Sequence, residues 1–240
     1  MQIDLKNKKA LVTGGRGLAA GIIEGLAAAG ASVAVISKSG ACPLCARGFK
    51  ADIGDRSQRK TAFNTAVEYL GGIDILVNCA GIQRRHELEE FPLEDWDEVI
   101  EVNLTAAWEL AQLAAREMIR AGHGGKIINI ASMLSFFGGL RIPAYAAAKG
   151  GIAQITKSMA IGWARYGIQV NALAPGYMDT DMNTALKNDE ARFNTILSRI
   201  PAGRWGTPKD MAGPCVFLAS SLSDYITGAV IPVDGGYLVM

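Results

Sequence analysis

Tyr145 and Lys149 are separated by three alanines near the start of a segment with a helical pattern. This spacing places both side chains on one face of a helix, one turn apart. A phenol has a pKa of about 10 in water, which is too high for efficient proton transfer at neutral pH. Because an ammonium group stabilises a nearby phenolate, Lys149 is expected to lower the pKa of Tyr145. The pair could act as a general acid and base, although a packed tyrosine and an extended lysine are also common in alanine-rich helices.

Two further polar residues stand where chemistry explains them better than packing. Ser132 follows the apolar run GKIINIA, at the end of a predicted strand, where open α/β sheets bind their ligands. Asn103 interrupts the long helical pattern around EVNLTAA. Asparagine is unfavourable inside a helix, so its amide is expected to have a specific function there. With Tyr145 and Lys149, these residues form a candidate catalytic group.

The segment ALVTGGRGLAAG, residues 10–21, has the pattern of a strand, a tight glycine turn and a helix. Such a turn can hold a dinucleotide pyrophosphate against backbone N–H groups at the start of the helix. The usual fingerprint is longer, since only two residues separate Gly14 from Gly17, and Ala19 replaces its last glycine. We expect the turn to bind a dinucleotide, either weakly or in an altered pose.

Strand and helix patterns alternate along the chain, without repeats or linkers. The predicted strands are residues 9–13, 32–37, 48–52, 73–78, 125–130, 168–174 and 229–233. Most are continuous apolar runs, as expected for strands buried on both faces of a parallel sheet. The pattern predicts one α/β domain over residues 1–240, a Rossmann-like doubly wound sheet of about seven strands with helices on both faces. Only KSGACPLCARG joins the second and third strands, so the helix after the second strand is expected to be shortened or missing.

Composition excludes several classes of function. The net charge of +1 indicates no electrostatic footprint for nucleic acid or a membrane surface. No apolar run approaches the about 20 residues of a spanning helix, and no signal peptide is recognisable, so a cytoplasmic protein is expected. Cys42 and Cys45 have metal-ligand spacing, but zinc needs more ligands than this isolated pair offers, and no metal site is predicted.

A set of short motifs occurs in order along the whole chain: Thr13-Gly14, Asn78-Cys79-Ala80-Gly81, Asn103, Ser132, Tyr145-x-x-x-Lys149, Pro175-Gly176 and Asp234-Gly235-Gly236. This set resembles the motifs of the short-chain dehydrogenase/reductase family. The resemblance implies an oxidoreductase in which a nicotinamide cofactor carries out the redox chemistry and the protein positions the reactants.

The resemblance implies a role for each member of the catalytic group. Tyr145 would be the general acid/base on the substrate oxygen, and Ser132 would polarise that oxygen through a hydrogen bond. Lys149 would lower the pKa of Tyr145 and hold the nicotinamide ribose, and Asn103 would support a water in a proton relay. Two O–H groups in place before the reaction would stabilise the charge that develops on a carbonyl oxygen.

The resemblance also assigns the contacts of the cofactor. In this family the residue that ends the second strand selects the cofactor, and an acidic side chain there favours NAD. Ser37 and Lys38 stand at this place, and Arg16 precedes Gly17. A small residue flanked by cations favours a phosphate, so NADP(H) is the expected cofactor and NAD(H) is the alternative. The other expected contacts are Thr13, Gly14, Leu18, Asp52, Ile53, Asn78, Ala80, Gly81, Tyr145, Lys149, Pro175, Gly176 and Thr180.

Residues 73–240 resemble the bacterial sugar-acid dehydrogenases of this family most closely, in segments such as GIQRRHELEEF, RIPAYAAAKGG and RIPAGRWGTP. The expected substrate is therefore a small anionic keto or hydroxy sugar acid of the 2-keto-3-deoxygluconate or gluconate type. Arginine binds a carboxylate through two parallel hydrogen bonds, and Arg84 and Arg85 follow a strand end at the cleft mouth. The other candidate substrate contacts are Ser132, Met133, Arg141, Tyr145, Tyr177 and Arg204.

Two other interpretations stay open. An enzyme resembling 3-oxoacyl-carrier-protein reductase would need a basic surface for its acidic carrier, which the net charge of +1 does not support. A degenerate family member without turnover would fit the shortened turn, but not the retained catalytic group. The family resemblance further implies a homo-oligomer, commonly a tetramer, packed through the long helices that contain Asn103 and Tyr145 and through the C-terminal segment.

Overall fold

A single parallel sheet of seven strands lies at the centre of the computed structural model, which describes residues 3–240. Its strand order is β3-β2-β1-β4-β5-β6-β7. The strands are β1 (Lys9–Thr13), β2 (Ser32–Ser37), β3 (Arg47–Lys50), β4 (Ile75–Asn78), β5 (Gly125–Ile130), β6 (Ile168–Pro175) and β7 (Val230–Val233). Every neighbouring pair runs in parallel, which confirms the predicted Rossmann-like architecture. The order reverses direction between β1 and β4, the place where such sheets bind ligands.

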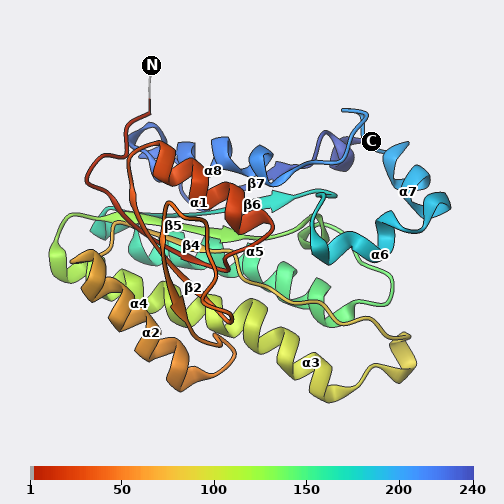
Figure 1. Ribbon diagram of the computed structural model, residues 1–240, viewed down its shortest axis with the longest axis horizontal. Coiled ribbons are helices and arrows are strands. Elements are labelled where there is room, and N and C mark those ends of the chain that lie inside the picture. Colours follow the sequence, from red (N-terminus) through yellow and green to blue (C-terminus); the bar gives the residue numbers. More distant parts are fainter. Residues whose placement is uncertain (1–2) are drawn as a thin grey trace.

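Helices cover both faces of the sheet (Figure 1). They are α1 (Leu18–Ala28), α2 (Arg56–Leu70), α3 (Leu93–Ile100), α4 (Ala106–Ala121), α5 (Pro143–Trp163), α6 (Thr184–Lys187), α7 (Glu190–Leu197) and α8 (Ala212–Ala219). The helices α1 and α8 pack on one face, and α2, α4 and α5 pack on the other. Each face buries its own apolar cluster, so the strands are enclosed on both sides as their continuous apolar runs predict. None of the helices in residues 3–240 is long and apolar enough to cross a membrane.

The connection between β2 and β3 contains no helix, as the sequence predicted. Residues 38–46 form a loop instead, closed by a turn in which the Ala46 N–H donates to the Pro43 carbonyl at 3.1 Å. This loop packs tightly on the glycine turn. A Cβ atom added to Gly15 would lie 1.8 Å from the Ala41 carbonyl oxygen, so the contact requires glycine at this position.

The long helical pattern before Gly122 is divided into three parts by a π-helical turn, Glu101–Thr105, which joins α3 to α4. Its Asn103 side chain is 2% exposed, and both ends of the amide bind the backbone of Ile82. The Ile82 N–H donates to Asn103 Oδ1 at 2.8 Å, and Asn103 Nδ2 donates to the Ile82 carbonyl at 2.8 Å. These bonds fix the wider turn beside the loop that follows β4, a location typical of π-turns at functional sites.

Candidate active site

Two adjoining clefts lie at the carboxyl-end edge of the sheet. The first has a volume of about 560 Å³ and is lined by the glycine turn, the end of β2 and the loop after β4. The second has a volume of about 580 Å³ and contains Ser132 and Tyr145. Leu18, Thr180 and Met182 line both clefts, so the two spaces are continuous. Their sizes are those of binding sites for cofactors and small molecules.

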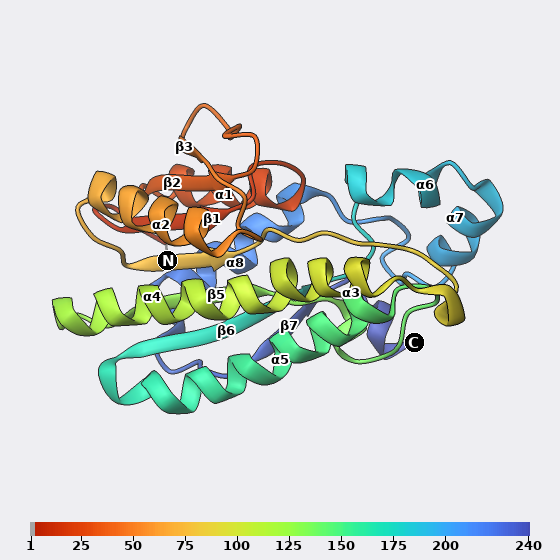
Figure 2. The ribbon, with the colours of Figure 1, turned by 90° about the horizontal axis from the view of Figure 1, so that it is seen from below.

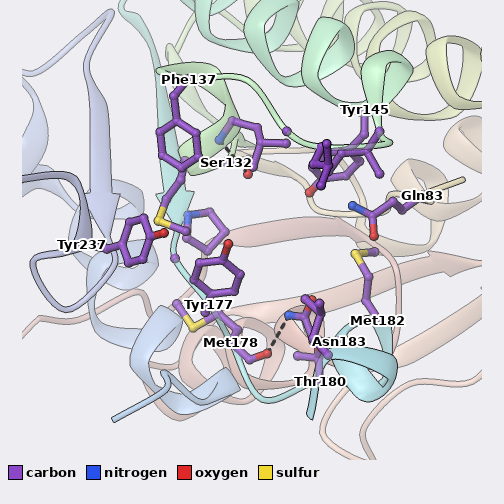
Figure 3. Close-up of a pocket in the computed structure, with 18 of the residues that line it drawn as sticks. Gln83, Ser132, Phe137, Tyr145, Tyr177, Met178, Thr180, Met182, Asn183 and Tyr237 are labelled. Atoms are coloured by element: carbon purple, nitrogen blue, oxygen red, sulfur yellow. Dashed lines mark hydrogen bonds between the residues drawn. The ribbon is translucent and has the colours of Figure 1, made fainter. Parts of the chain in front are cut away.

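Ser132 and Tyr145 present their hydroxyl groups to the second cleft (Figure 3). Pro143 starts α5 and places Tyr145 in its first turn. Ser132 follows β5, is 7% exposed, and accepts a hydrogen bond from the Leu134 N–H at 3.1 Å. Burial raises the pKa of Tyr145 to about 12, while the hydrogen bond with Ser132 favours the phenolate. At neutral pH the tyrosine therefore holds its proton.

Lys149 is 4% exposed and extends beneath Tyr145, with its Nζ atom 5.6 Å from the centre of the tyrosine ring. Its ammonium group donates to the Ile130 carbonyl at 2.6 Å. Burial lowers the pKa of Lys149 to about 8. Desolvation of the phenol has the largest effect on the pKa of Tyr145 and raises it, so the expected lowering by Lys149 is not the net result.

Several polar residues predicted to touch the cofactor hold the scaffold together. Thr13 Oγ1 accepts hydrogen bonds from the N–H groups of Cys79 and Ala80, at 3.0 and 3.1 Å. Asn78 Nδ2 donates to the Ala107 carbonyl and to Asn129 Oδ1, both at 3.0 Å. These bonds tie the ends of β1, β4 and β5 to one another and to α4, and so position the loops that line both clefts.

The first cleft has features that fit a dinucleotide. Gly14 and Gly17 adopt positive φ angles of 86° and 55°, so the chain can turn tightly before α1. No side chain caps the start of α1, and the positive end of the helix dipole there favours an anion. Predicted cofactor residues that line this cleft are Gly14, Arg16, Gly17, Leu18, Ser37, Lys38, Asp52, Ile53, Ala80, Gly81 and Thr180. Pro175, Gly176 and Tyr145 line the second cleft instead, and Thr13, Asn78 and Lys149 are outside both linings.

The two predicted cations differ in their surroundings. Lys38 Nζ lies 2.6 Å from Asp52 Oδ2, and its side chain is 79% exposed. The hydrogen bond with Lys38 lowers the pKa of the Asp52 carboxyl, which therefore stays ionised. Arg16 is exposed and also lines the cleft. A phosphate bound here would be attracted to Arg16 and Lys38 and repelled by Asp52.

The predicted substrate arginines are not equivalent. Arg85 lines the second cleft, as do the predicted contacts Met133 and Tyr177. Arg84 pairs with Glu98 at 2.6 Å, Arg141 pairs with Glu87 at 3.0 Å and Arg204 pairs with Asp210 at 2.7 Å, and all three are outside this lining. The structure adds lining residues that no sequence motif indicated, namely Gln83, Asn183, Arg192 and Arg199.

A buried arginine that no sequence motif indicated braces the walls of the first cleft. Arg59 on α2 has no exposed surface. Its guanidinium donates to Glu101 at 2.9 Å and also to Glu109 and the Ile53 carbonyl. Ile53 lines the first cleft, while Glu101 begins the π-helical turn that carries Asn103. Arg59 therefore fixes Ile53 relative to the π-helical turn, whose Val102 also lines the first cleft.

Comparison with known proteins identifies the family. A family model for short-chain enzymes of this fold, described as enoyl-(acyl carrier protein) reductase, matches residues 12–238. The chain belongs to the short-chain dehydrogenase/reductase family. It is 46% identical to 2-dehydro-3-deoxy-D-gluconate 5-dehydrogenase from Dickeya dadantii over 98% of this chain and 97% of the relative. It is 48% identical to the Bacillus subtilis protein of the same name over 98% of this chain and 96% of the relative.

A solved structure of a short-chain dehydrogenase/reductase supports the same relationship. The gluconate 5-dehydrogenase of Burkholderia cenocepacia, crystallised with NADP and tartrate, superimposes with a TM-score of 0.94. The two proteins are 41% identical, and the match covers 100% of this chain and 98% of the other. The fold and the family predicted from the motifs are therefore confirmed.

Proposed function

We propose that this chain transfers a hydride between NADP(H) and a small keto or hydroxy sugar acid of the 2-keto-3-deoxygluconate or gluconate type. The observation that carries this proposal is the pair of hydroxyl groups, Ser132 and Tyr145, that faces a cleft continuous with the glycine-turn cleft. The relatives named as sugar-acid dehydrogenases, which align over almost the full chain, support the substrate class.

The catalytic residues act on the substrate oxygen. A bound nicotinamide cofactor would supply or accept the hydride at the neighbouring carbon. Tyr145, protonated at neutral pH, donates its proton to the carbonyl oxygen in reduction, and Ser132 donates a hydrogen bond that stabilises the developing negative charge. In oxidation, Tyr145 takes the proton back. Lys149 anchors the region through the Ile130 carbonyl and favours the phenolate when its ammonium is charged.

The residues of the glycine turn, the end of β2 and the loop after β4 would hold the cofactor. Arg16 and Lys38 favour a 2′-phosphate, since no acidic residue ends β2 and both cations line the cleft. The relative crystallised with NADP supports the same preference. NAD(H) is the alternative, because the Lys38 charge is already partly matched by Asp52.

Calorimetric titration of the purified protein with NADPH and with NADH tests the cofactor, and NADPH is expected to bind more tightly. The reduction of 5-keto-D-gluconate with the preferred cofactor then tests the reaction. Tighter binding of NADH would refute the proposal that Arg16 and Lys38 bind the 2′-phosphate of NADP(H). Absence of binding to either cofactor would favour a family member without turnover, in which the shortened turn has abolished the site.

We also infer that the protein forms a homo-oligomer, with a tetramer as the expected size. Trp108 of α4 stacks on Trp163 of α5 at 6.1 Å, and Trp108 is 41% exposed. Ile161, also on α5, is 83% exposed. The two helices run side by side in Figure 2 and offer an apolar surface that a second copy could cover. A cytoplasmic location stays a prediction from the sequence.

A further inference from the structure

Three arginine side chains line the second cleft without an acidic partner. Arg85 comes from the loop after β4, Arg192 from α7, and Arg199 from the segment that follows α7. Within residues 3–240, no Asp or Glu side chain forms an ion pair with any of them, and none lines the cleft. Met240, the last residue of the sequence, also lines the cleft, so three arginine charges face at most one carboxylate there and the lining keeps a net positive charge.

The helix α7, which carries Arg192 and leads into Arg199, is fixed beside the cleft. Asp189 caps the helix by accepting a hydrogen bond from the Arg192 N–H at 3.0 Å. Phe193 stacks on Trp205 with ring centres 5.2 Å apart, and Ile196 is buried in the same cluster. One side of α7 is thus anchored in an apolar cluster. Arg192 on α7 and Arg199, two residues beyond the end of this helix, both line the cleft.

Two of the three guanidinium groups are held in place by neighbouring side chains. Arg199 lies over the ring of Tyr237, 4.6 Å from its centre, and Tyr237 is 5% exposed. Arg85 is half-buried and donates to Gln83 Oε1 at 3.2 Å. Burial and the neighbouring Arg192 charge lower the pKa of Arg85. Like charges that face one cleft repel one another, and a bound anion would relieve this repulsion.

We propose that Arg85, Arg192 and Arg199 bind the carboxylate of the substrate and select acids over neutral sugars. This inference rests on the proposed function and deepens it. Figure 3 places Tyr237, the residue under Arg199, on the opposite wall of the cleft from Tyr145. A sugar acid would therefore bind with its carboxylate at the arginines and its reacting carbon at the two hydroxyl groups. Arginine suits this role because its planar fork matches a carboxylate.

Two substrates that differ only at the carboxylate test the proposal. L-Sorbose is the neutral counterpart of 5-keto-D-gluconate, with a CH₂OH group in place of the carboxylate. The variants R192Q and R199Q are each expected to raise the KM for 5-keto-D-gluconate roughly tenfold with little change in kcat, since each removes a charged hydrogen bond. Their kcat/KM for L-sorbose should equal that of the wild type. R192K should recover part of the loss, because it restores the charge without the fork.

Lys60→Gln, which removes an exposed cation on α2, is the matched control and should behave like the wild type toward both substrates. An unchanged preference for the acid in R192Q and R199Q would overturn the proposal. Calorimetric titration of wild type and R192Q with D-gluconate needs no turnover and separates this result from a failure of the proposed reaction. Weaker binding by R192Q is expected, and equal behaviour of the two proteins would refute the arginine site even if the enzyme proves inactive.

Discussion

Replacement of Lys149 by Met should change how the stability of the unliganded protein depends on pH. Burial lowers the pKa of Lys149 from 10.5 to about 8. Between these two pH values the lysine is protonated in the unfolded chain but neutral in the folded protein. The stability of the wild type therefore rises with pH through this window. With a pKa of 10.5 in the unfolded chain and about 8 in the folded protein, the free energy of unfolding increases by about 2 kcal/mol between about pH 7 and about pH 9.5.

The Lys149→Met variant lacks this gain, so its free energy of unfolding relative to the wild type should fall by about 2 kcal/mol over the same range. Urea denaturation at a series of pH values measures the difference directly. Other titrating groups are common to both proteins and cancel in the comparison. Lys157→Met, on the exposed side of the same helix, should keep the pH dependence of the wild type. A difference between wild type and Lys149→Met that stays constant with pH would refute the reasoning that burial alone depresses this pKa.

The remaining predictions concern the elements that position the clefts. Arg59→Met should reduce the free energy of unfolding by about 3 kcal/mol in urea denaturation, because it leaves carboxylates without their buried partner; a loss below about 1 kcal/mol would contradict this. Gly15→Ala should weaken NADPH binding by at least about tenfold in calorimetry, because its Cβ would displace the Ala41 carbonyl, and unchanged binding would show that the loop yields. Lys38→Ala should weaken NADPH binding about fivefold and leave NADH binding unchanged; equal effects on both would exclude contact with the 2′-phosphate.

Much of the fold follows from local patterns in the sequence. Continuous apolar runs correctly predicted most of the seven strands, because the strands of a parallel sheet buried on both faces carry apolar residues at successive positions. The short segment between β2 and β3 correctly predicted a missing helix. Strand limits were less accurate, and β3 ends at Lys50 rather than residue 52. The reason is local, since Asp52 forms a turn by accepting a hydrogen bond from the Gly54 N–H at 3.0 Å.

The site was predictable where chemistry fixes spacing along the chain. Tyr145 and Lys149 lie one turn apart on one helix, so their proximity is encoded locally. Arg192 and Arg199 have no such signal, because only the packing of α7 against Trp205 brings them to the cleft. Arg59 is similar, since its two carboxylate partners, Glu101 and Glu109, come from elements far away in the sequence.

The most direct test of the proposed function is the rate of NADPH-dependent reduction of 5-keto-D-gluconate by the wild type and by Tyr145→Phe. We predict turnover by the wild type and a loss of at least about 100-fold in kcat in the variant, since the proton donor to the substrate oxygen is removed. Thermal unfolding of both proteins should confirm that the variant is folded. Equal rates for the two proteins, or no turnover of this or related keto sugar acids by the wild type, would contradict the proposed function.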